Sequence, residues 1–174
     1  MRIACVLTNG YEDSEFQQPY EEFTRAGHQV VVIGKQAGEE IAGKKGQSKT
    51  KAELAIDQAK PDQFEALLIP GGGSPDSLRA DPRFVDFVKA FFRANKPVFA
   101  ICHGPQLMIT ADEYKGRRLT AWKTIQGDLK RMGADVVDQE VVVDGNLVTS
   151  RQPSDIPAFV RESLQVMQKA PVGR

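Results

Sequence analysis

Four short, nearly continuous apolar runs alternate along this chain with segments of helical periodicity. The runs are Ile3–Thr8, Val30–Gly34, Ala66–Pro70 and Val98–Cys102. Apolar runs of this length are typical of strands that are covered on both faces, as they are in parallel sheets. The alternation with short links predicts an α/β fold of one domain over residues 1–174, a three-layer sandwich with a mostly parallel central sheet.

The segments between the runs predict helices with identifiable start and stop signals. Phe16, Tyr20 and Phe23 recur at helical spacing between the first two runs. Pro19 interrupts this pattern, so we expect a short turn of helix and then a longer helix that has Pro19 in its first turn and ends at Gly27. The remaining predicted elements are a helix over residues 81–95 capped by Asp81, a helix that ends at Gly133, a hairpin over residues 141–150 and a helix over residues 154–168.

The charge balance and hydropathy exclude several classes of function. Lys+Arg and Asp+Glu both number 23, so the formal net charge is 0, which excludes a broad electrostatic grip on nucleic acid or on an anionic membrane. No apolar run approaches the roughly 18 residues that a membrane span requires. The polar, lysine-rich stretch over residues 38–60 is interpreted as a solvated hairpin and connector rather than as a binding patch.

The cysteines and histidines are too few for a disulfide framework or a zinc site. Cys5 and Cys102 are the only cysteines, and we expect both to be reduced thiols in the cytoplasm. His28 and His103 are the only histidines, and no Cys-x-x-Cys pair accompanies them, so we expect no metal and no cofactor.

Polar and glycine-rich loops follow three of the predicted strands. They cover residues 8–13, 70–76 and 102–105. In open α/β sheets the binding site forms at the carboxyl ends of the strands. We therefore expect these three loops to meet and to form the functional site.

Cys102 is the candidate nucleophile. The sequence Ala-Ile-Cys-His-Gly over residues 100–104 has the outline of a nucleophile elbow, with cysteine in place of serine and alanine in place of the first glycine. A thiol at the start of a helix favours the thiolate, because the helix dipole and free N–H groups stabilise negative charge. The alternative is a buried, inert cysteine, which is how we interpret Cys5 in the middle of a strand.

His103 and Glu12 are the candidate proton carriers. His103 follows the nucleophile and could act as a general base or as an imidazolium, or it could only pack beside the turn. His28 is expected to be polar surface. The Glu12 carboxyl could reach Cys102, where its protonated form would favour the thiolate by donating a hydrogen bond. Alternatively, Glu12 only complements the dipole of the helix that follows it.

The three successive glycines over residues 71–73 are candidates for an oxyanion hole. Gly72 and Gly73 would let backbone N–H groups approach a ligand closely. The loop fits neither common phosphate-binding pattern, because no lysine follows it and Asp76 stands at the last glycine position of G-x-G-x-x-G.

These motifs together resemble the PfpI family of the ThiJ/PfpI superfamily, over essentially the whole chain. The matching pieces are Asn-Gly-Tyr-Glu-Asp over residues 9–13, Pro-Gly-Gly over 70–72 with residues 75–79, Ala-Ile-Cys-His-Gly-Pro-Gln over 100–106, and residues 140–145 with 150–155. Several motifs in the same order make the resemblance specific.

The resemblance implies a flavodoxin-like sandwich of the class I glutamine amidotransferase type, in a homodimer or larger homo-oligomer. It implies Cys102 as the nucleophile, Glu12 as its carboxyl partner and oxyanion donors near Gly72 and His103. In peptidase-like members an acidic residue from a neighbouring subunit orients the histidine, and Asp76 is the matching position. Trp122 matches an aromatic residue that lines the site, with core packing as the alternative.

We therefore expect a cysteine-dependent stress-response enzyme of the glyoxalase or deglycase type that acts on reactive aldehydes or glycation adducts without a cofactor. Arg151 could hold an anion at the rim of the site, or it could form a surface ion pair. The alternatives are an intracellular cysteine peptidase with an intersubunit Cys-His-Asp arrangement, and a non-catalytic redox sensor or chaperone. The expected partners are an aldehyde, glycated or peptide substrate and further copies of the chain, with no membrane and no strong nucleic-acid binding.

Overall fold

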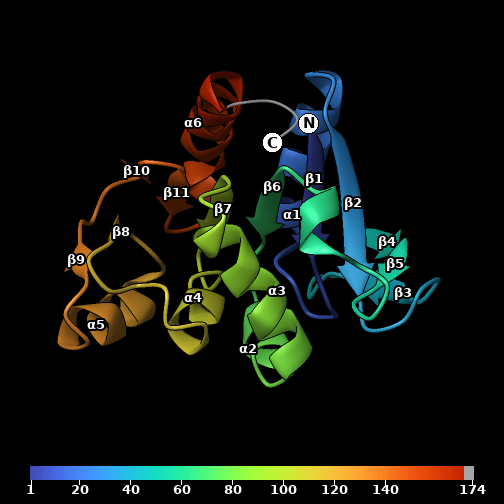
Figure 1. Cartoon of the computed structure of the whole chain (residues 1–174), viewed down its shortest axis with the longest axis horizontal. Helices are drawn as coiled ribbons and strands as arrows, with labels where there is room; N and C mark the ends of the chain where they lie inside the picture. Colours follow the sequence, from blue (N-terminus) through green and yellow to red (C-terminus); the bar gives the residue numbers. More distant parts are fainter. Residues whose placement is uncertain (171–174) are drawn as a thin grey trace.

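A seven-stranded, mostly parallel sheet forms the centre of the molecule, which we describe over residues 1–170 of a computed structural model. The strand order is β10-β11-β7-β6-β1-β2-β5, and only the β10–β11 pair is antiparallel. The strands are β1 (Arg2–Val6), β2 (Gln29–Gly34), β5 (Leu54–Ala55), β6 (Ala66–Ile69), β7 (Val98–Ile101), β10 (Val142–Asp144) and β11 (Leu147–Ser150). The predicted flavodoxin-like class and the predicted hairpin are confirmed (Figure 1).

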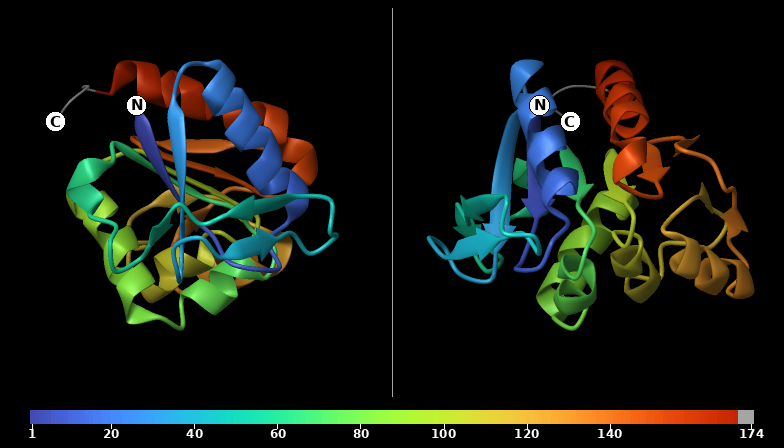
Figure 2. Two further views of the ribbon diagram at one scale, coloured as in Figure 1. Left: turned by 90° about the vertical axis from the view of Figure 1, so that its right-hand side faces the viewer. Right: turned by 180° about the vertical axis from the view of Figure 1, so that it is seen from behind.

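Helices cover both faces of this sheet, which completes the three predicted layers. On one face lie α1 (Asp13–Arg25) and α6 (Ile156–Lys169), which contact each other, and α3 (Pro82–Arg93) lies on the other (Figure 2). Adjacent residues of β1 show the division, because Ala4 packs in the core on the α3 side and Cys5 in the core on the α1 side. The shorter helices α2 (Ser74–Leu78), α4 (Gln106–Thr110) and α5 (Lys123–Arg131) add to the α3 side. Among the described residues, no helix is both long enough and apolar enough to cross a membrane.

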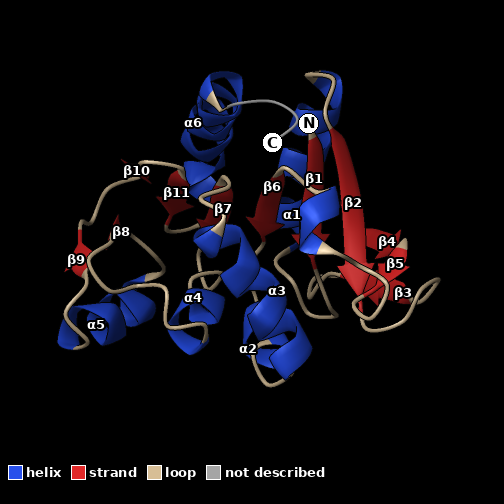
Figure 3. Ribbon diagram, viewed as in Figure 1, coloured by secondary structure: helices blue, strands red, loops and turns tan. Residues whose placement is uncertain are grey.

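Two small sheets flank the main one at opposite ends of the molecule (Figure 3). One is the antiparallel hairpin of β3 (Glu40–Ala42) and β4 (Lys49–Lys51), as predicted for the lysine-rich stretch. The other pairs β8 (Arg118–Leu119) with β9 (Asp135–Val136) in parallel. The elements of residues 1–170 also include two 3-10 turns, η1 (Pro61–Gln63) and η2 (Pro153–Asp155).

The prediction that Pro19 divides the first helical segment is wrong. A single helix, α1, passes through Pro19. A proline in a helix interior costs about 3 kcal/mol, because it removes one backbone hydrogen bond and crowds the preceding turn. Phe16 and Phe23 on the same helix are both buried against the sheet, and this packing outweighs the local cost.

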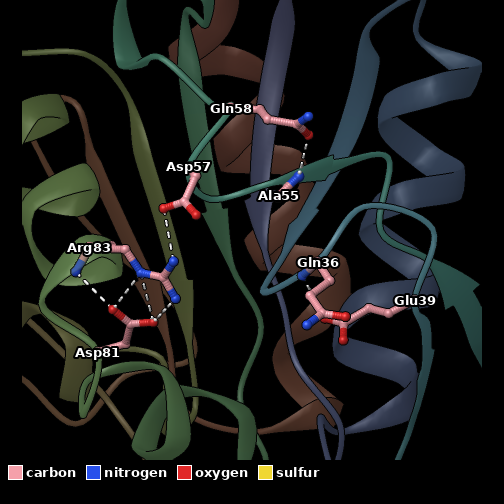
Figure 4. Close-up of polar contacts among 7 residues, drawn as sticks. All are labelled: Gln36, Glu39, Ala55, Asp57, Gln58, Asp81 and Arg83. Atoms are coloured by element: carbon pink, nitrogen blue, oxygen red, sulfur yellow. Dashed lines mark hydrogen bonds and ion pairs between the residues drawn. The ribbon is translucent and has the colours of Figure 1, made fainter.

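The start of α3 is held by a compact group of charges (Figure 4). The Asp81 carboxylate accepts a hydrogen bond of 3.0 Å from the Arg83 backbone N–H, which confirms the predicted helix cap. The Arg83 guanidinium pairs with Asp81 at 2.7 Å and with Asp57 at 2.8 Å. These pairs connect the first turn of α3 to the segment that follows β5.

Candidate active site

The three loops that follow β1, β6 and β7 meet at one edge of the sheet. The order β7-β6-β1 makes these strands neighbours, so their carboxyl ends lie side by side. Tyr11, after β1, pairs through its backbone with Gly72, after β6, and on its other side with Gly43, in the turn between β3 and β4. The predicted convergence of the loops is confirmed, and a fourth segment from the lysine-rich hairpin joins them.

Cys102 occupies a strained turn at the end of β7. Its φ of 64° lies in the left-handed region, which is uncommon for a residue with a side chain. Its N–H donates to Ser150 O at 2.9 Å, and its carbonyl accepts from the Trp122 N–H at 2.9 Å. A Cβ on Gly104 would lie 2.6 Å from Ile69 O, so only glycine fits at this point of the elbow. The side chain is buried, with 7% of the residue exposed.

The carboxyl group beside Cys102 belongs to Glu15, which corrects the assignment of Glu12. Glu12 precedes α1 in an extended conformation, and its two carboxylate oxygens pair with Lys44 and Lys45 at 2.7 and 2.8 Å. Glu15, in the first turn of α1, is fully buried and accepts a 2.9 Å hydrogen bond from Gly71 N–H. Its carboxyl is close enough to the Cys102 thiol to raise the pKa of that thiol. Glu15 Oε2 is buried without a hydrogen-bond partner among the described residues.

Burial sets the protonation states of this pair. It raises the pKa of Glu15 to about 8, against the Gly71 hydrogen bond that favours the carboxylate. Burial and the nearby Glu15 raise the pKa of Cys102 to about 12, although the backbone N–H groups of His103 and Gly72 favour the thiolate. This direction is opposite to the expected stabilisation of the thiolate at the start of a helix, because two amides do not compensate for the loss of water. At neutral pH the pair therefore consists of the Glu15 carboxylic acid and the adjacent Cys102 thiol, both protonated.

His103 lies within hydrogen-bonding distance of Cys102. Its Nδ1 is 3.3 Å from Cys102 Sγ, and its ring stacks on Trp122 with centroids 6.2 Å apart. Burial, and then the positive charge of Lys44, lower the pKa of His103, so the imidazole is neutral at physiological pH. A neutral ring can accept a proton from the thiol. His28, in contrast, accepts from the N-terminal amine of Met1 at 2.9 Å, which uses one of its ring nitrogens.

Of the two predicted oxyanion donors in the glycine loop, only one faces the site. Gly72 has a φ of 75°, and its backbone N–H favours the Cys102 thiolate, which acts to lower the pKa of Cys102. The Gly73 N–H donates to Gly10 O at 2.8 Å, so this donor is already used. The available amides are therefore those of Gly72 and His103.

Asp76 and Arg151 make ion pairs of their own. The Asp76 side chain is 66% exposed and pairs with Arg79 at 3.0 Å, and it reaches His103 only through its charge, which acts to raise the pKa of His103. Arg151 forms two side-chain hydrogen bonds to Asp155, at 3.0 and 3.1 Å, and a 3.1 Å ion pair with Asp138. The ion-pair alternative for Arg151 is the one observed.

Three residues at the site were not predicted from the sequence, namely Glu15, Lys44 and Asp13. The position of Glu15, one helical turn after Glu12 near a predicted strand end, was a signal that could have identified it. Asp13 accepts hydrogen bonds from the backbone N–H groups of residues 45, 47 and 48 at 2.8 to 2.9 Å. Nothing in the local pattern of the lysine-rich stretch indicates that it folds back onto Asp13.

Comparisons with known proteins show the family to which this chain belongs. The model of the DJ-1/PfpI family matches residues 1–166. Protein/nucleic acid deglycase 2 of Escherichia coli (strain K12) is 54% identical over 167 residues, which cover 95% of this chain and 97% of that protein. General stress protein 18 of Bacillus subtilis (strain 168) is 53% identical over 169 residues, which cover 97% of this chain and 98% of that protein.

A solved structure from Anabaena variabilis has the same fold. It is a two-domain protein with DJ-1/ThiJ/PfpI-like and ferritin-like domains, and it superposes with a TM-score of 0.93 at 38% identity. The match covers 96% of this chain and 48% of that longer chain. Because the family model spans nearly the whole sequence and the two bacterial relatives match end to end, this chain is a member of the DJ-1/PfpI family.

Proposed function

We propose that the chain is a cysteine-dependent enzyme that acts on reactive aldehydes or their glycation adducts. The observation that carries this proposal is the grouping of the Cys102 thiol, a protonated Glu15 and a neutral His103 at one strand end. The similarity to a protein named a deglycase and to one named a general stress protein supports the same substrate class.

In this reaction the Cys102 sulfur adds to the aldehyde carbon of a substrate such as methylglyoxal. His103 Nδ1 accepts the thiol proton, and the N–H groups of Gly72 and His103 stabilise the developing alkoxide, which is then protonated to give a hemithioacetal. A thiol with a raised pKa needs such a base as it attacks.

Glu15 is the group suited to the next step, because a pKa of about 8 lets it lose and regain a proton near neutrality. Protonated Glu15 first donates its proton to the alkoxide of the adduct, and the resulting carboxylate then moves a proton from the first carbon to the second, which oxidises one carbon and reduces the other. The proton held by His103 then returns Glu15 to its acid form. Water then hydrolyses the resulting thioester to lactate and free Cys102. The overall reaction converts one methylglyoxal and one water to lactate, so it needs no added oxidant.

The test measures loss of methylglyoxal together with formation of lactate. We expect Cys102→Ala to lower kcat/KM by at least about a thousandfold, because covalent catalysis is lost. Cys5→Ala is the matched control: Cys5 is fully buried in mid-strand and should lose stability without losing chemistry. Equal rates for the native protein and Cys102→Ala would refute the proposal.

A cysteine peptidase is the second candidate, and one observation favours it. The Asp76 carboxylate is largely exposed, and its charge acts to raise the pKa of His103. In a peptidase, an Asp76 carboxylate from a neighbouring subunit could therefore orient His103. In that case Asp76→Asn should impair peptide hydrolysis while methylglyoxal turnover continues. The redox-sensor alternative is less favoured, because a raised thiol pKa leaves little of the readily oxidised thiolate.

The chain is proposed to act as a homodimer. A groove of about 590 Å³ lies between α1 and α6, apart from Cys102, and it is lined by Gln18, Glu21, Glu22, Ile156, Pro157, Val160, Arg161 and Leu164. Its apolar floor has acidic residues on the α1 side and Arg161 on the α6 side, so a two-fold axis would place opposite charges together. A second copy of the chain is therefore the proposed occupant.

Light scattering checks this proposal. We expect a particle of twice the 19.2 kDa chain mass, and a shift toward the single chain for Arg161→Glu. Arg131→Glu, at an 80% exposed position on α5, is the control and should not change the mass. A single-chain mass at all protein concentrations would contradict the dimer.

The proposed location is the cytoplasm. Cys5 and Cys102 are both free thiols, which is the state expected in a reducing compartment.

A further inference from the structure

We propose that the turn between β3 and β4 forms an anion subsite, in which Lys44 and Lys45 recognise a carboxylate on the substrate. The subsite would select aldehyde adducts of carboxylate-bearing thiols or amines over neutral adducts. In such an adduct the Cys102 sulfur displaces the thiol or amine, which leaves with the proton of the Cys102 thiol. This inference rests on the proposed function and specifies the substrate class of the same site.

The turn is held rigidly against the start of α1. The Asp13 carboxylate, 3% exposed, accepts three backbone hydrogen bonds from the turn, including those of Lys45 and Ser48 at 2.8 and 2.9 Å. The Lys44 N–H donates to Tyr11 O at 2.8 Å, and the Tyr11 hydroxyl bonds to Ser48 Oγ at 2.8 Å. These hydrogen bonds fix the backbone that carries the two lysines. Less conformational entropy is therefore lost when a ligand binds to them.

Two lysines share one carboxylate. Lys44 Nζ lies 2.7 Å from Glu12 Oε2, and Lys45 Nζ lies 2.8 Å from Glu12 Oε1. Glu12 is buried, whereas the two lysine side chains are 49% and 55% exposed. An ammonium group has three donors, and each of these shows one contact to a described residue, so both keep donors that face solvent.

Lys44, Lys45, Glu12 and Asp13 together carry no net formal charge, but both carboxylates are buried whereas the two lysine side chains are about half exposed, so it is the positive charge that faces solvent. Asp13, the other carboxylate of this segment, is satisfied by backbone N–H dipoles rather than by an ammonium group. The neighbouring Glu15 and His103 are both neutral at physiological pH, so neither supplies a negative charge. A substrate carboxylate would therefore meet two ammonium groups with donors that face solvent and no exposed carboxylate of this group of four residues.

The lysine turn is close enough to the nucleophile for one substrate to reach both. Tyr11 pairs with Gly43 on one side and with Gly72 on the other, which places the turn roughly 10 Å, two strand spacings, from the glycine loop. A Cβ on Gly71 would lie 2.9 Å from Cys102 Cβ, so the glycine loop touches the nucleophile. The charge of Lys44 accordingly acts on Cys102, Glu15 and His103.

The test compares two methylglyoxal hemithioacetals that differ in one charge, those of N-acetylcysteine and of N-acetylcysteine amide. We expect the native protein to favour the carboxylate adduct by about three- to tenfold in kcat/KM, the range of a partly exposed ion pair. Lys44→Met should slow the carboxylate adduct more than the neutral adduct and so abolish this preference, and Lys44→Arg should retain it. Lys49→Met, at an exposed position of β4 in the same hairpin, is the matched control.

A second readout does not depend on turnover of the adducts. N-acetylglycine should inhibit methylglyoxal consumption competitively, and Lys44→Met should weaken that inhibition while the neutral N-acetylglycine amide has no effect. Equal kcat/KM for the two adducts in the native protein, together with no inhibition by N-acetylglycine, would overturn the anion subsite and leave the proposed function intact. No turnover of any aldehyde would instead overturn the proposed function.

Discussion

Glu15→Gln is expected to lower kcat/KM by about a hundred- to a thousandfold while it stabilises the folded protein at alkaline pH. The loss of activity follows because glutamine cannot transfer a proton, although it preserves the shape of the side chain and the acceptor for Gly71 N–H. The rate of the native protein should fall above a pH of about 8 as Glu15 ionises, and this alkaline limb should be absent in the variant.

The stability effect has a definite sign. Burial raises the pKa of Glu15 from 4.5 to about 8, so in that pH range the folded protein binds more protons than the unfolded chain. The contribution of Glu15 to the free energy of unfolding is therefore full below a pH of 4.5 and is lost as the pH rises through about 8. Glutamine does not ionise, so the variant should gain a few kcal/mol relative to the native protein above that range.

Urea unfolding at acidic and alkaline pH measures this gain, and Glu12→Gln is the matched control. Burial alone would raise the pKa of Glu12, but its hydrogen bonds and charge interactions with Lys44 and Lys45 lower it. Glu12→Gln should therefore destabilise the protein at neutral pH and show no gain at alkaline pH. The same pH dependence in both variants would contradict the assignment of Glu15 as the buried acid.

Gly71→Ala is expected to destabilise the protein by about 1–3 kcal/mol and to reduce activity by about a hundredfold. The new Cβ would lie 2.5 Å from Glu15 Oε1, 2.8 Å from Ile101 O and 2.9 Å from Cys102 Cβ. Two of these three atoms belong to the proposed catalytic pair, so any displacement that relieves the overlap moves the reacting groups apart.

Gly73→Ala is the control for this substitution. The nearest atom to its Cβ would be Gly10 O at 3.6 Å, and its φ of −82° suits any residue. We expect native activity and a change in unfolding free energy within about 0.5 kcal/mol. Thermal unfolding and the methylglyoxal assay measure both effects, and equal behaviour of the two variants would show that the glycine loop does not hold the catalytic pair.

Much of the fold could be predicted because the patterns that specify it are local. The run over residues 98–102 is apolar on both faces, and it forms the interior strand β7 with Cys102 just beyond its end. The Asp81 cap and the hairpin over residues 141–150 depend on neighbouring residues only, and both are confirmed. Pro19 was misjudged because its local cost is outweighed by packing that no local pattern contains.

The amino-acid order alone was sufficient to place a nucleophile on a turn, with a histidine beside it and a glycine loop nearby. Which carboxyl meets the sulfur, and whether that sulfur is an anion, depended on how distant segments pack. Glu12 and Glu15 look equivalent in the sequence, yet one pairs with two lysines from another hairpin and the other is enclosed beside Cys102. The physical reason is that burial and through-space charge control protonation, and neither exists until residues far apart in the chain exclude water together.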